Sequence, residues 1–258
     1  MKFEILNRNE LLDCEKCIKT KRAILYFKED KLVKVFNTDP YLSNHSNNNL
    51  TGIVNYQTIE TQENILKEIS KINEEEFVLP NRVLYKKRVD TQNLIGYDMT
   101  NLKYYSELEE YLETNDISFN DRKKLSEKLC EIFTGLEKYK ISYWDIHARN
   151  IMINGESLKV VDMDSVTAKE TNGAFSYRVD LSCSYYNLSS LILSILYNIN
   201  EEYLLKKIKS GRINSLLKKN ELFKNVIEFD GKIIYPIEYL NDFTEDYVKE
   251  TRRLILKR

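Results

Sequence analysis

Glycine and proline are scarce in this chain, and the glycines are unevenly placed. The 258 residues contain seven glycines and three prolines, and no glycine precedes Gly52. The segment before Gly52 therefore excludes a G-x-G-x-x-G loop, which needs closely spaced glycines. The few prolines leave little to mark element boundaries, and the chain has no internal repeat.

No charge sign dominates the chain, and no apolar run is long. Lys and Arg total 39 against 40 Asp and Glu, a formal charge of -1, so we expect no nucleic-acid partner. The start MKFEILNRNE lacks the apolar core of a secretory signal, and the most apolar stretch, Leu191 to Tyr197, is too short to span a bilayer. We therefore expect a cytoplasmic protein with no membrane partner.

The four cysteines do not form a metal-binding pattern. Cys14 and Cys17 make one C-x-x-C, but neither a second pair nor a histidine cluster supplies the other ligands of a structural zinc site. A thioredoxin-like pair would lie at a strand-to-helix turn, whereas LLDCEKC predicts a short polar helix. We assign these cysteines no chemistry.

The first hundred residues alternate strand and helix patterns. Residues 22–36 predict a hairpin with a turn at Lys28 to Lys31, and residues 38–49 predict a polar loop. Apolar residues spaced as on one helix face predict an amphipathic helix over residues 59–72. Two further strands are expected at residues 83–89 and 93–99.

The remaining residues are mainly helical in pattern. Asp121 is positioned to begin a helix whose apolar face continues to Tyr139. Residues 151–153 and 158–161 predict a β-hairpin, with Asn154 and Gly155 in its turn. Later helices are expected at residues 188–198, 201–210 and 245–256. The whole pattern predicts an α+β fold with two lobes, residues 1–101 with a β-sheet and one helix, and residues 102–258 mainly helical with the hairpin.

Polar side chains gather at both ends of that hairpin. Asp145 and Asn150 precede its first strand, and Asp162 follows its second. Antiparallel pairing brings all three to the same open end. Two carboxylates and an amide oxygen suit Mg²⁺, which takes few protein ligands and completes its octahedron with phosphate and water oxygens.

The segments Tyr143 to Asn150 and Val160 to Asp164 resemble the protein-kinase-like superfamily, in which an Asp, an Asn five positions later and a further Asp after a hairpin form the site. The resemblance covers most of residues 22–198. It implies a bilobal fold with a small β-rich lobe and a mainly helical lobe, with ATP and Mg²⁺ as cofactors. It also implies that Asp145 orients the acceptor hydroxyl and that Asn150 and Asp162 bind magnesium.

Lys34 is the candidate for the strand lysine that contacts the nucleotide phosphates in this superfamily. Leu32, Lys34 and Phe36 share one face of the expected strand, so Lys34 interrupts an apolar face and needs an anionic partner there. An exposed strand-edge lysine is the alternative.

The resemblance also implies a helix glutamate paired with Lys34. Glu63 is preferred over Glu60, and a solvated surface position is the alternative for either. By the same resemblance, Met99 lies at the back of an adenine pocket, with backbone groups of Thr100 to Leu102 hydrogen-bonding the base.

The sequence also departs from the common protein-kinase motifs. Tyr143 and Trp144 stand where His-Arg is usual, and Met163 and Asp164 replace Phe-Gly, so control by a phosphorylated loop is not expected. His147 is similar to the aminoglycoside and choline kinase branch and is a candidate for contact with the transferred phosphate; a structural histidine is the alternative. Asp164 fits either a position near the metal or a turn.

We expect a kinase that transfers the γ-phosphate of ATP to a hydroxyl. The short stretch between Thr100 and Asp145 resembles protein kinases and favours a protein Ser or Thr acceptor. His147 and the acidic stretch from Tyr105 to Asp116 favour the alternative, a small-molecule acceptor of the aminoglycoside or choline type. The missing glycine loop keeps a pseudokinase binding module as a further alternative, and AMP transfer to proteins is another.

Overall fold

The computed structural model describes residues 1–7, 9–12, 14–20, 23–36, 59–90, 93–211 and 220–257. The chain divides into two compact units, Met1–Tyr104 and Tyr105–Arg258. The first contains a mostly antiparallel sheet and the second is mainly helical, so the predicted α+β class is correct. The boundary expected from the sequence lies between residues 101 and 102. The loop expected at residues 38–49 and the side chain of Glu60 lie outside the described residues.

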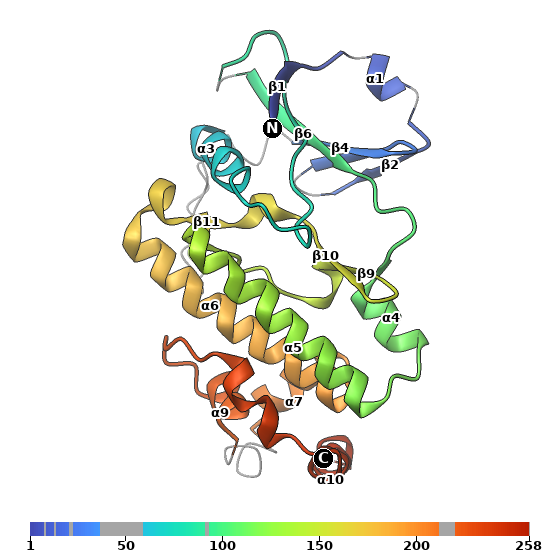
Figure 1. Ribbon diagram of the computed structural model, residues 1–258, viewed down its shortest axis with the longest axis vertical. Helices are drawn as coiled ribbons and strands as arrows, with labels where there is room; N and C mark the ends of the chain where they lie inside the picture. Colours follow the sequence, from blue (N-terminus) through green and yellow to red (C-terminus); the bar gives the residue numbers. More distant parts are fainter. Residues whose placement is uncertain are drawn as a thin grey trace. The chain divides into compact units, whose positions relative to one another are not determined.

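The N-terminal unit is built on a six-stranded sheet (Figure 1). Its strand order is β1-β5-β6-β4-β3-β2, and β1 pairs with β5 in parallel while the other neighbours are antiparallel. The strands are β1 (Lys2–Ile5), β2 (Lys16–Lys19), β3 (Ala23–Phe27), β4 (Lys31–Phe36), β5 (Arg82–Tyr85) and β6 (Leu94–Thr100). Among the described residues of this unit, helices form at α1 (Asn9–Leu12) and α3 (Ile59–Ile69).

The hairpin, the helix and the two strands expected at residues 22–36, 59–72, 83–89 and 93–99 are present with small changes of length. The β3–β4 hairpin has its turn where it was predicted, closed by a hydrogen bond from the Lys28 N–H to the Lys31 carbonyl at 2.9 Å. The predicted amphipathic helix forms as α3 but ends at Ile69. The strand expected at residues 83–89 ends earlier, at Tyr85, where its pairing with β6 becomes irregular.

The prediction of a helix across Cys14 and Cys17 is wrong. The helix α1 ends at Leu12, and Cys17 lies in β2 opposite Tyr26 of β3. The local sequence is polar, but pairing with β3 satisfies the backbone groups of the segment, and tertiary pairing of this kind overrides local propensity. The strand β1 was also not expected from the sequence.

One face of this sheet packs against the chain's N-terminal segment. Leu6, Val33 and Leu84 form a buried cluster there, and Leu11 and Tyr26 pack on it. Arg82 also stabilises this segment by forming ion pairs with carboxylates on three different elements. Its guanidinium contacts Glu4 at 2.9 Å, Glu10 at 2.8 Å and the buried Asp98 at 2.6 Å. These ion pairs lower the pKa of Glu10, chiefly through the hydrogen bond from Arg82.

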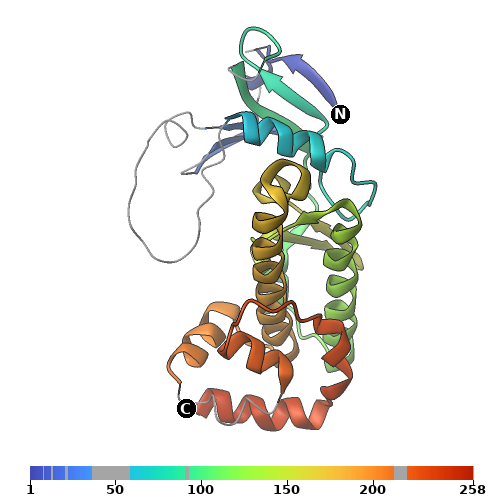
Figure 2. The same cartoon turned by 90° about the vertical axis from the view of Figure 1, so that its left-hand side faces the viewer.

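Helices α5 and α6 form the core of the C-terminal unit, and they lie side by side (Figure 2). Ser118 begins α5, because its hydroxyl accepts the N–H of Asp121 at 3.2 Å and donates to the Asp121 carboxylate at 2.6 Å. The helix therefore starts at Phe119, two positions before the predicted Asp121, and Asp121 serves as the partner of the cap.

The helix α6 is far longer than the segment predicted at 188–198. It begins at Lys169, bends at Gly173, where φ is 84°, and continues to Tyr197. The end of this helix, Leu188 to Tyr197, is buried and contains the apolar stretch Leu191 to Tyr197 identified in the sequence; α7, α9 and α10 pack around it (Figure 2).

In the described part of this unit, the helices are α4 (Leu108–Thr114), α5 (Phe119–Gly135), α6 (Lys169–Tyr197), α7 (Glu201–Lys209), α9 (Glu221–Ile227) and α10 (Glu245–Lys257). The 3₁₀ turns are η2 (Leu136–Tyr139), η3 (Ala148–Asn150), η4 (Met163–Ser165) and η5 (Pro236–Asp242). Short strands pair as β7 (Ser106–Glu107) with β9 (Ile151–Asn154), β9 with β10 (Ser157–Val160), and β8 (Ile141–Ser142) with β11 (Thr167–Ala168). In the described part of the chain, no helix combines the length and the apolar character needed to cross a membrane.

Candidate active site

The β9–β10 hairpin forms as expected, and its open end organises the candidate site. Ile151 pairs with Val160 as the last register pair, so Asn150 and Val161 come next on the two strands. The N–H of Val161 donates to the carbonyl of Asn150 at 3.0 Å, which extends the pairing by one step. The antiparallel register therefore brings Asn150 beside the residue that precedes Asp162.

Asn150 holds Asp145 directly. Its Nδ2 group donates to the backbone carbonyl of Asp145 at 3.0 Å and lies 3.3 Å from Oδ2 of the same residue. Both contacts use the amide nitrogen, so the amide oxygen is left to face other groups. The spacing of five residues identified in the sequence thus corresponds to a side-chain contact across the loop.

His147 contacts the other oxygen of the Asp145 carboxylate. Its Nε2 atom is 3.5 Å from Oδ1 of Asp145, and the two side chains are 31% and 29% exposed. The buried Nδ1 atom of His147 makes no hydrogen bond with any described residue. Asp145 is therefore oriented from both sides and still reaches solvent, as a group that acts on an incoming hydroxyl must.

Asp162 adopts a backbone conformation that is rare for residues other than glycine. Its φ and ψ are 61° and 35°, in the left-handed region, and it begins the η4 turn, in which the Ser165 N–H donates to the Asp162 carbonyl at 3.1 Å. Aspartate tolerates this region better than most side chains, and such strained positions cluster at functional sites. Asp164, in the same turn, is buried.

The three aspartates share a common neighbour in Tyr143. Burial is the largest cause that raises the pKa of its phenol well above the ordinary value, followed by the charges of Asp162, Asp145 and Asp164. The carboxylates of two separate loops therefore act on one buried hydroxyl, which places Asp145 and Asp162 in one electrostatic environment.

This donor set fits a hard cation such as Mg²⁺. Two carboxylates and one amide oxygen are few ligands, and Mg²⁺ keeps several water or phosphate oxygens in its shell. Among the described residues, no three or more His, Cys, Asp or Glu side chains are arranged as a metal cluster of their own.

Helix α6 and a short strand pair hold the loop that carries Asp145. The side chain of Asn187 donates to the carbonyl of Trp144, and Trp144 is 36% exposed. On the other side, Thr167 of β11 pairs with Ser142 of β8 and donates its hydroxyl to Asp180 of α6. Burial raises the pKa of Asp180, and the Thr167 hydrogen bond opposes that shift.

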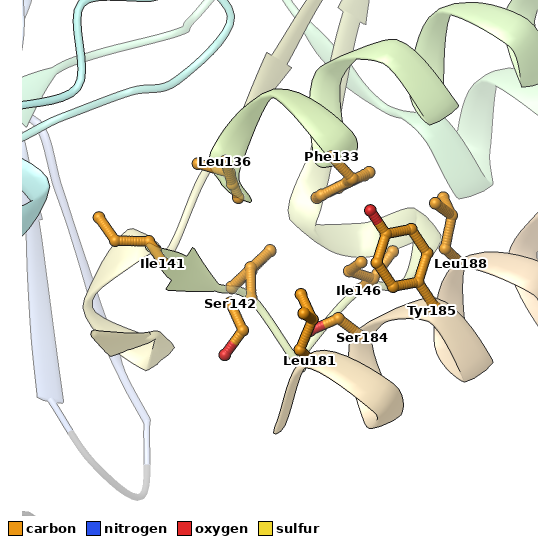
Figure 3. A pocket seen from close by; sticks show the side chains of 10 residues that line it. Phe133, Leu136, Ile141, Ser142, Ile146, Leu181, Ser184, Tyr185 and Leu188 are labelled. Carbon is orange, nitrogen blue, oxygen red and sulfur yellow. The ribbon is translucent and has the colours of Figure 1, made fainter. Parts of the chain in front are cut away.

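An apolar hollow lies behind this loop. Tyr143 and Ile146, on either side of Asp145, line it together with side chains of α5, β8 and α6 (Figure 3). In Figure 3 the side chains of Ile146, Leu181 and Tyr185 converge on it. Its interior has room for about one water molecule, which is too little for a nucleotide.

Glu201, at the first position of α7, is a titratable group that the sequence did not single out. Burial raises its pKa from 4.5 to about 7, the nearby Glu109 adds to the rise, and the Ser190 hydroxyl, the Ala148 backbone and Arg149 oppose it. The folded state therefore favours protonated Glu201. Its ionisation destabilises the fold increasingly as the pH rises from 4.5 through 7, and the effect is complete above that range.

We expect Glu201→Gln to stabilise the protein at pH 8 by roughly 1 to 3 kcal/mol, because glutamine removes the partly buried charge but keeps the shape. The gain should shrink as the pH falls through 7 toward 4.5, and it should vanish below 4.5, where the wild-type carboxyl is protonated in both states. Denaturant unfolding at several pH values measures it. The matched control is Glu202→Gln, at an exposed neighbouring position, which should change stability by less than about 0.5 kcal/mol. Equal stability of wild type and Glu201→Gln at pH 8 would contradict the assignment.

The N-terminal unit buries both residues assigned to phosphate binding. Lys34 and Glu63 are each 8% exposed. Lys34 lies opposite Tyr97 in the β4–β6 register, with its Nζ 5.6 Å from the centre of the Tyr97 ring. Glu63 forms an ion pair with Lys67 at 2.9 Å and contributes to the raised pKa of Tyr85, whose main cause is burial.

The side chains of Lys34 and Glu63 lie on the same face of this sheet. Val83 and Lys34 both pair with Tyr97, so the three side chains share a face, and Tyr85 follows Val83 by two residues on β5. Because Glu63 acts on Tyr85, α3 presents it toward that face. Buried lysine and glutamate side chains are rare unless they are paired.

Part of the segment assigned to the adenine pocket already forms hydrogen bonds within the N-terminal unit. Met99 is buried and pairs with Leu32. The Asn101 N–H donates to the Asp30 carbonyl at 3.2 Å, and its side chain donates to the Lys28 carbonyl at 2.5 Å. The backbone N–H of Asn101 is therefore used within this unit and is not a donor for the base.

Gly96 is a structural requirement beside Lys34 that the sequence analysis overlooked. A Cβ atom on Gly96 would lie 1.9 Å from the carbonyl oxygen of Lys34. The available signal was an isolated glycine inside a strand pattern, which indicates close backbone approach.

Residues 108–114 of the acidic stretch from Tyr105 to Asp116 form α4, and part of the negative charge of this stretch is compensated. Oε2 of Glu109 lies 3.9 Å from the guanidinium Nε of Arg149, next to Asn150, and the side chain of Asn200 is 3.5 Å from the other Glu109 oxygen. This arrangement links α4 to the candidate site through Arg149.

Comparison of the chain with protein-family models gave no match, and a search of the curated proteins gave none either.

Proposed function

We propose that this chain is a phosphotransferase of the protein-kinase-like type, which uses ATP and Mg²⁺ to transfer the γ-phosphate to a hydroxyl group. The observation that carries this proposal is the contact of Asn150 with Asp145 at the open end of a hairpin whose other strand leads into Asp162. Besides burial, the charges of all three aspartates of the two loops raise the pKa of Tyr143, and this supports the same arrangement.

Each residue then has a separate role. Asn150 and Asp162 would hold the magnesium ion, which neutralises charge on the nucleotide phosphates. Asp145, partly exposed and oriented by Asn150 and His147, would accept or orient the proton of the acceptor hydroxyl. In the N-terminal unit, Lys34 would contact the phosphates and Glu63 would orient that lysine, in line with their burial on one sheet face.

The short connection after Asp162 favours a small-molecule acceptor over the protein acceptor expected from the sequence. Only residues 163–168 separate Asp162 from α6, and Thr167 and Ala168 are buried and paired with β8. A protein substrate that binds in an extended form needs a free strand edge or groove beside the reacting group. This connection offers neither.

Transfer of label from ATP tests the proposal. The purified protein would be incubated with Mg²⁺ and ATP labelled at the γ or the α position, together with a panel of protein substrates and small amino alcohols. A kinase transfers the γ label only, whereas AMP transfer moves the α label. Transfer of neither label, with a Mg·ATP-dependent rise in melting temperature, would support a pseudokinase. Absence of both transfer and thermal shift would refute the proposal.

A further inference from the structure

Tyr143 occupies the position where the catalytic-loop motif departs from the superfamily pattern, and the proposed function assigns it no role. Its side chain is 1% exposed. The ring stacks on Phe133 of α5, with the ring centres 6.1 Å apart and the planes inclined by 18°. The direction of the phenol is therefore set by packing against a long helix, and few other rotamers are open to it.

The hydroxyl of Tyr143 holds the peptide that leads into Asp162. It donates to the carbonyl oxygen of Val161 at 3.1 Å. The N–H of the same Val161 donates to the carbonyl of Asn150 at 3.0 Å. Val161 is thus held on both of its backbone polar groups, and Asp162 follows directly in its strained left-handed conformation. Such conformations persist only where the surroundings enforce them.

The hydroxyl of Tyr143 is a donor at neutral pH, because the ordinary pKa of a tyrosine phenol is about 10. A neutral donor also adds no cation to the site, so the carboxylates keep their charge for a metal.

We propose that Tyr143 is a positioning residue that fixes the Asp162 carboxylate relative to Asn150 and Asp145, and so sets the affinity of the site for Mg²⁺. This inference rests on the proposed function. Residues that orient metal ligands through hydrogen bonds typically change metal affinity or activity by about 10- to 100-fold when replaced.

Tyr143→Phe tests the inference, because it keeps the stacked ring and removes only the hydroxyl. The matched control is Tyr185→Phe, which removes a buried phenol that donates to Glu137 and not to the Asp162 loop. We expect Tyr143→Phe to raise the Mg²⁺ concentration needed for half-maximal phosphoryl transfer by about 10- to 100-fold, with a much smaller change in kcat at saturating Mg²⁺. The control should keep the wild-type Mg²⁺ dependence.

A rescue variant separates positioning from general damage. Incorporation of 4-aminophenylalanine at position 143 restores an N–H donor in the same place and should recover most of the Mg²⁺ affinity. If Tyr143→Phe does not fold, recovery with 4-aminophenylalanine and loss with 4-methylphenylalanine at position 143 give the same comparison. Unchanged Mg²⁺ dependence without the donor, in a wild-type background that transfers phosphate, would overturn the inference and leave the function intact. A wild type without any Mg·ATP response would overturn both.

Discussion

Asp162→Asn is expected to reduce phosphoryl transfer by roughly 10³-fold, because a metal ion contributes several kcal/mol of charge stabilisation and each 1.4 kcal/mol is a factor of ten in rate. Asparagine tolerates the left-handed backbone that Asp162 adopts, so the variant should fold normally. The variant should also lose the Mg²⁺-dependent rise in melting temperature with ATP, because the substitution removes a charged ligand.

Asp145→Asn should lower turnover at the same site while leaving Mg·ATP binding intact. Its side-chain oxygen can still accept from Asn150 Nδ2, so the loop geometry and Mg·ATP binding should survive. Turnover should fall by about 10² to 10⁴-fold, the usual contribution of a positioned general base. Asp116→Asn, at an exposed loop position, is the matched control and should retain wild-type activity. Full activity in both Asp162→Asn and Asp145→Asn would refute the site assignment.

Gly96→Ala is expected to destabilise the N-terminal unit by about 3 kcal/mol or more. The added Cβ would lie 1.9 Å from the Lys34 carbonyl oxygen and 3.0 Å from two further backbone atoms of β4. Backbone cannot rotate away as a side chain can, so the two strands must separate, and forced overpacking commonly costs about 1 to 3 kcal/mol. Because the clash is with Lys34 itself, nucleotide-dependent stabilisation should be lost as well.

Gly135→Ala is the matched control, because it adds the same methyl group with no atom within 4 Å. Gly135 ends α5, where alanine favours the helix, so this variant should gain about 0.4 to 1 kcal/mol. Denaturant unfolding with and without Mg·ATP distinguishes the two variants. Unfolding of Gly96→Ala at the wild-type midpoint would contradict the close approach of β4 and β6.

Local patterns were sufficient where neighbours in sequence are also neighbours in space. The β3–β4 and β9–β10 hairpins were predictable, because short turns join strands that pair with each other. The hairpin register then placed Asn150 beside the strand end that leads to Asp162 without any long-range information. The helix α3 was predictable from its apolar face for the same reason.

Elements that depend on distant partners were missed. The strand β1 has Phe3 and Ile5 partly exposed and is a strand because it pairs with β5, about eighty residues later. The first half of α6 is polar and contains Gly173, so its sequence pattern did not indicate a helix continuous with the apolar stretch after Leu188. Its course is decided by packing against α5 and β11.

The sequence by itself determined the α+β class and the β9–β10 hairpin, and it supplied the candidates Asp145, Asn150, Asp162, Lys34 and Glu63, because residue type and spacing carry that information. Only the tertiary structure decided which groups support those candidates. The Tyr143 hydroxyl on Val161, the close approach of Gly96 to Lys34 and the raised pKa of Glu201 all arise from contacts between separate elements. Burial, close approach and local charge are properties of the packed chain, and spacing along the sequence does not encode them.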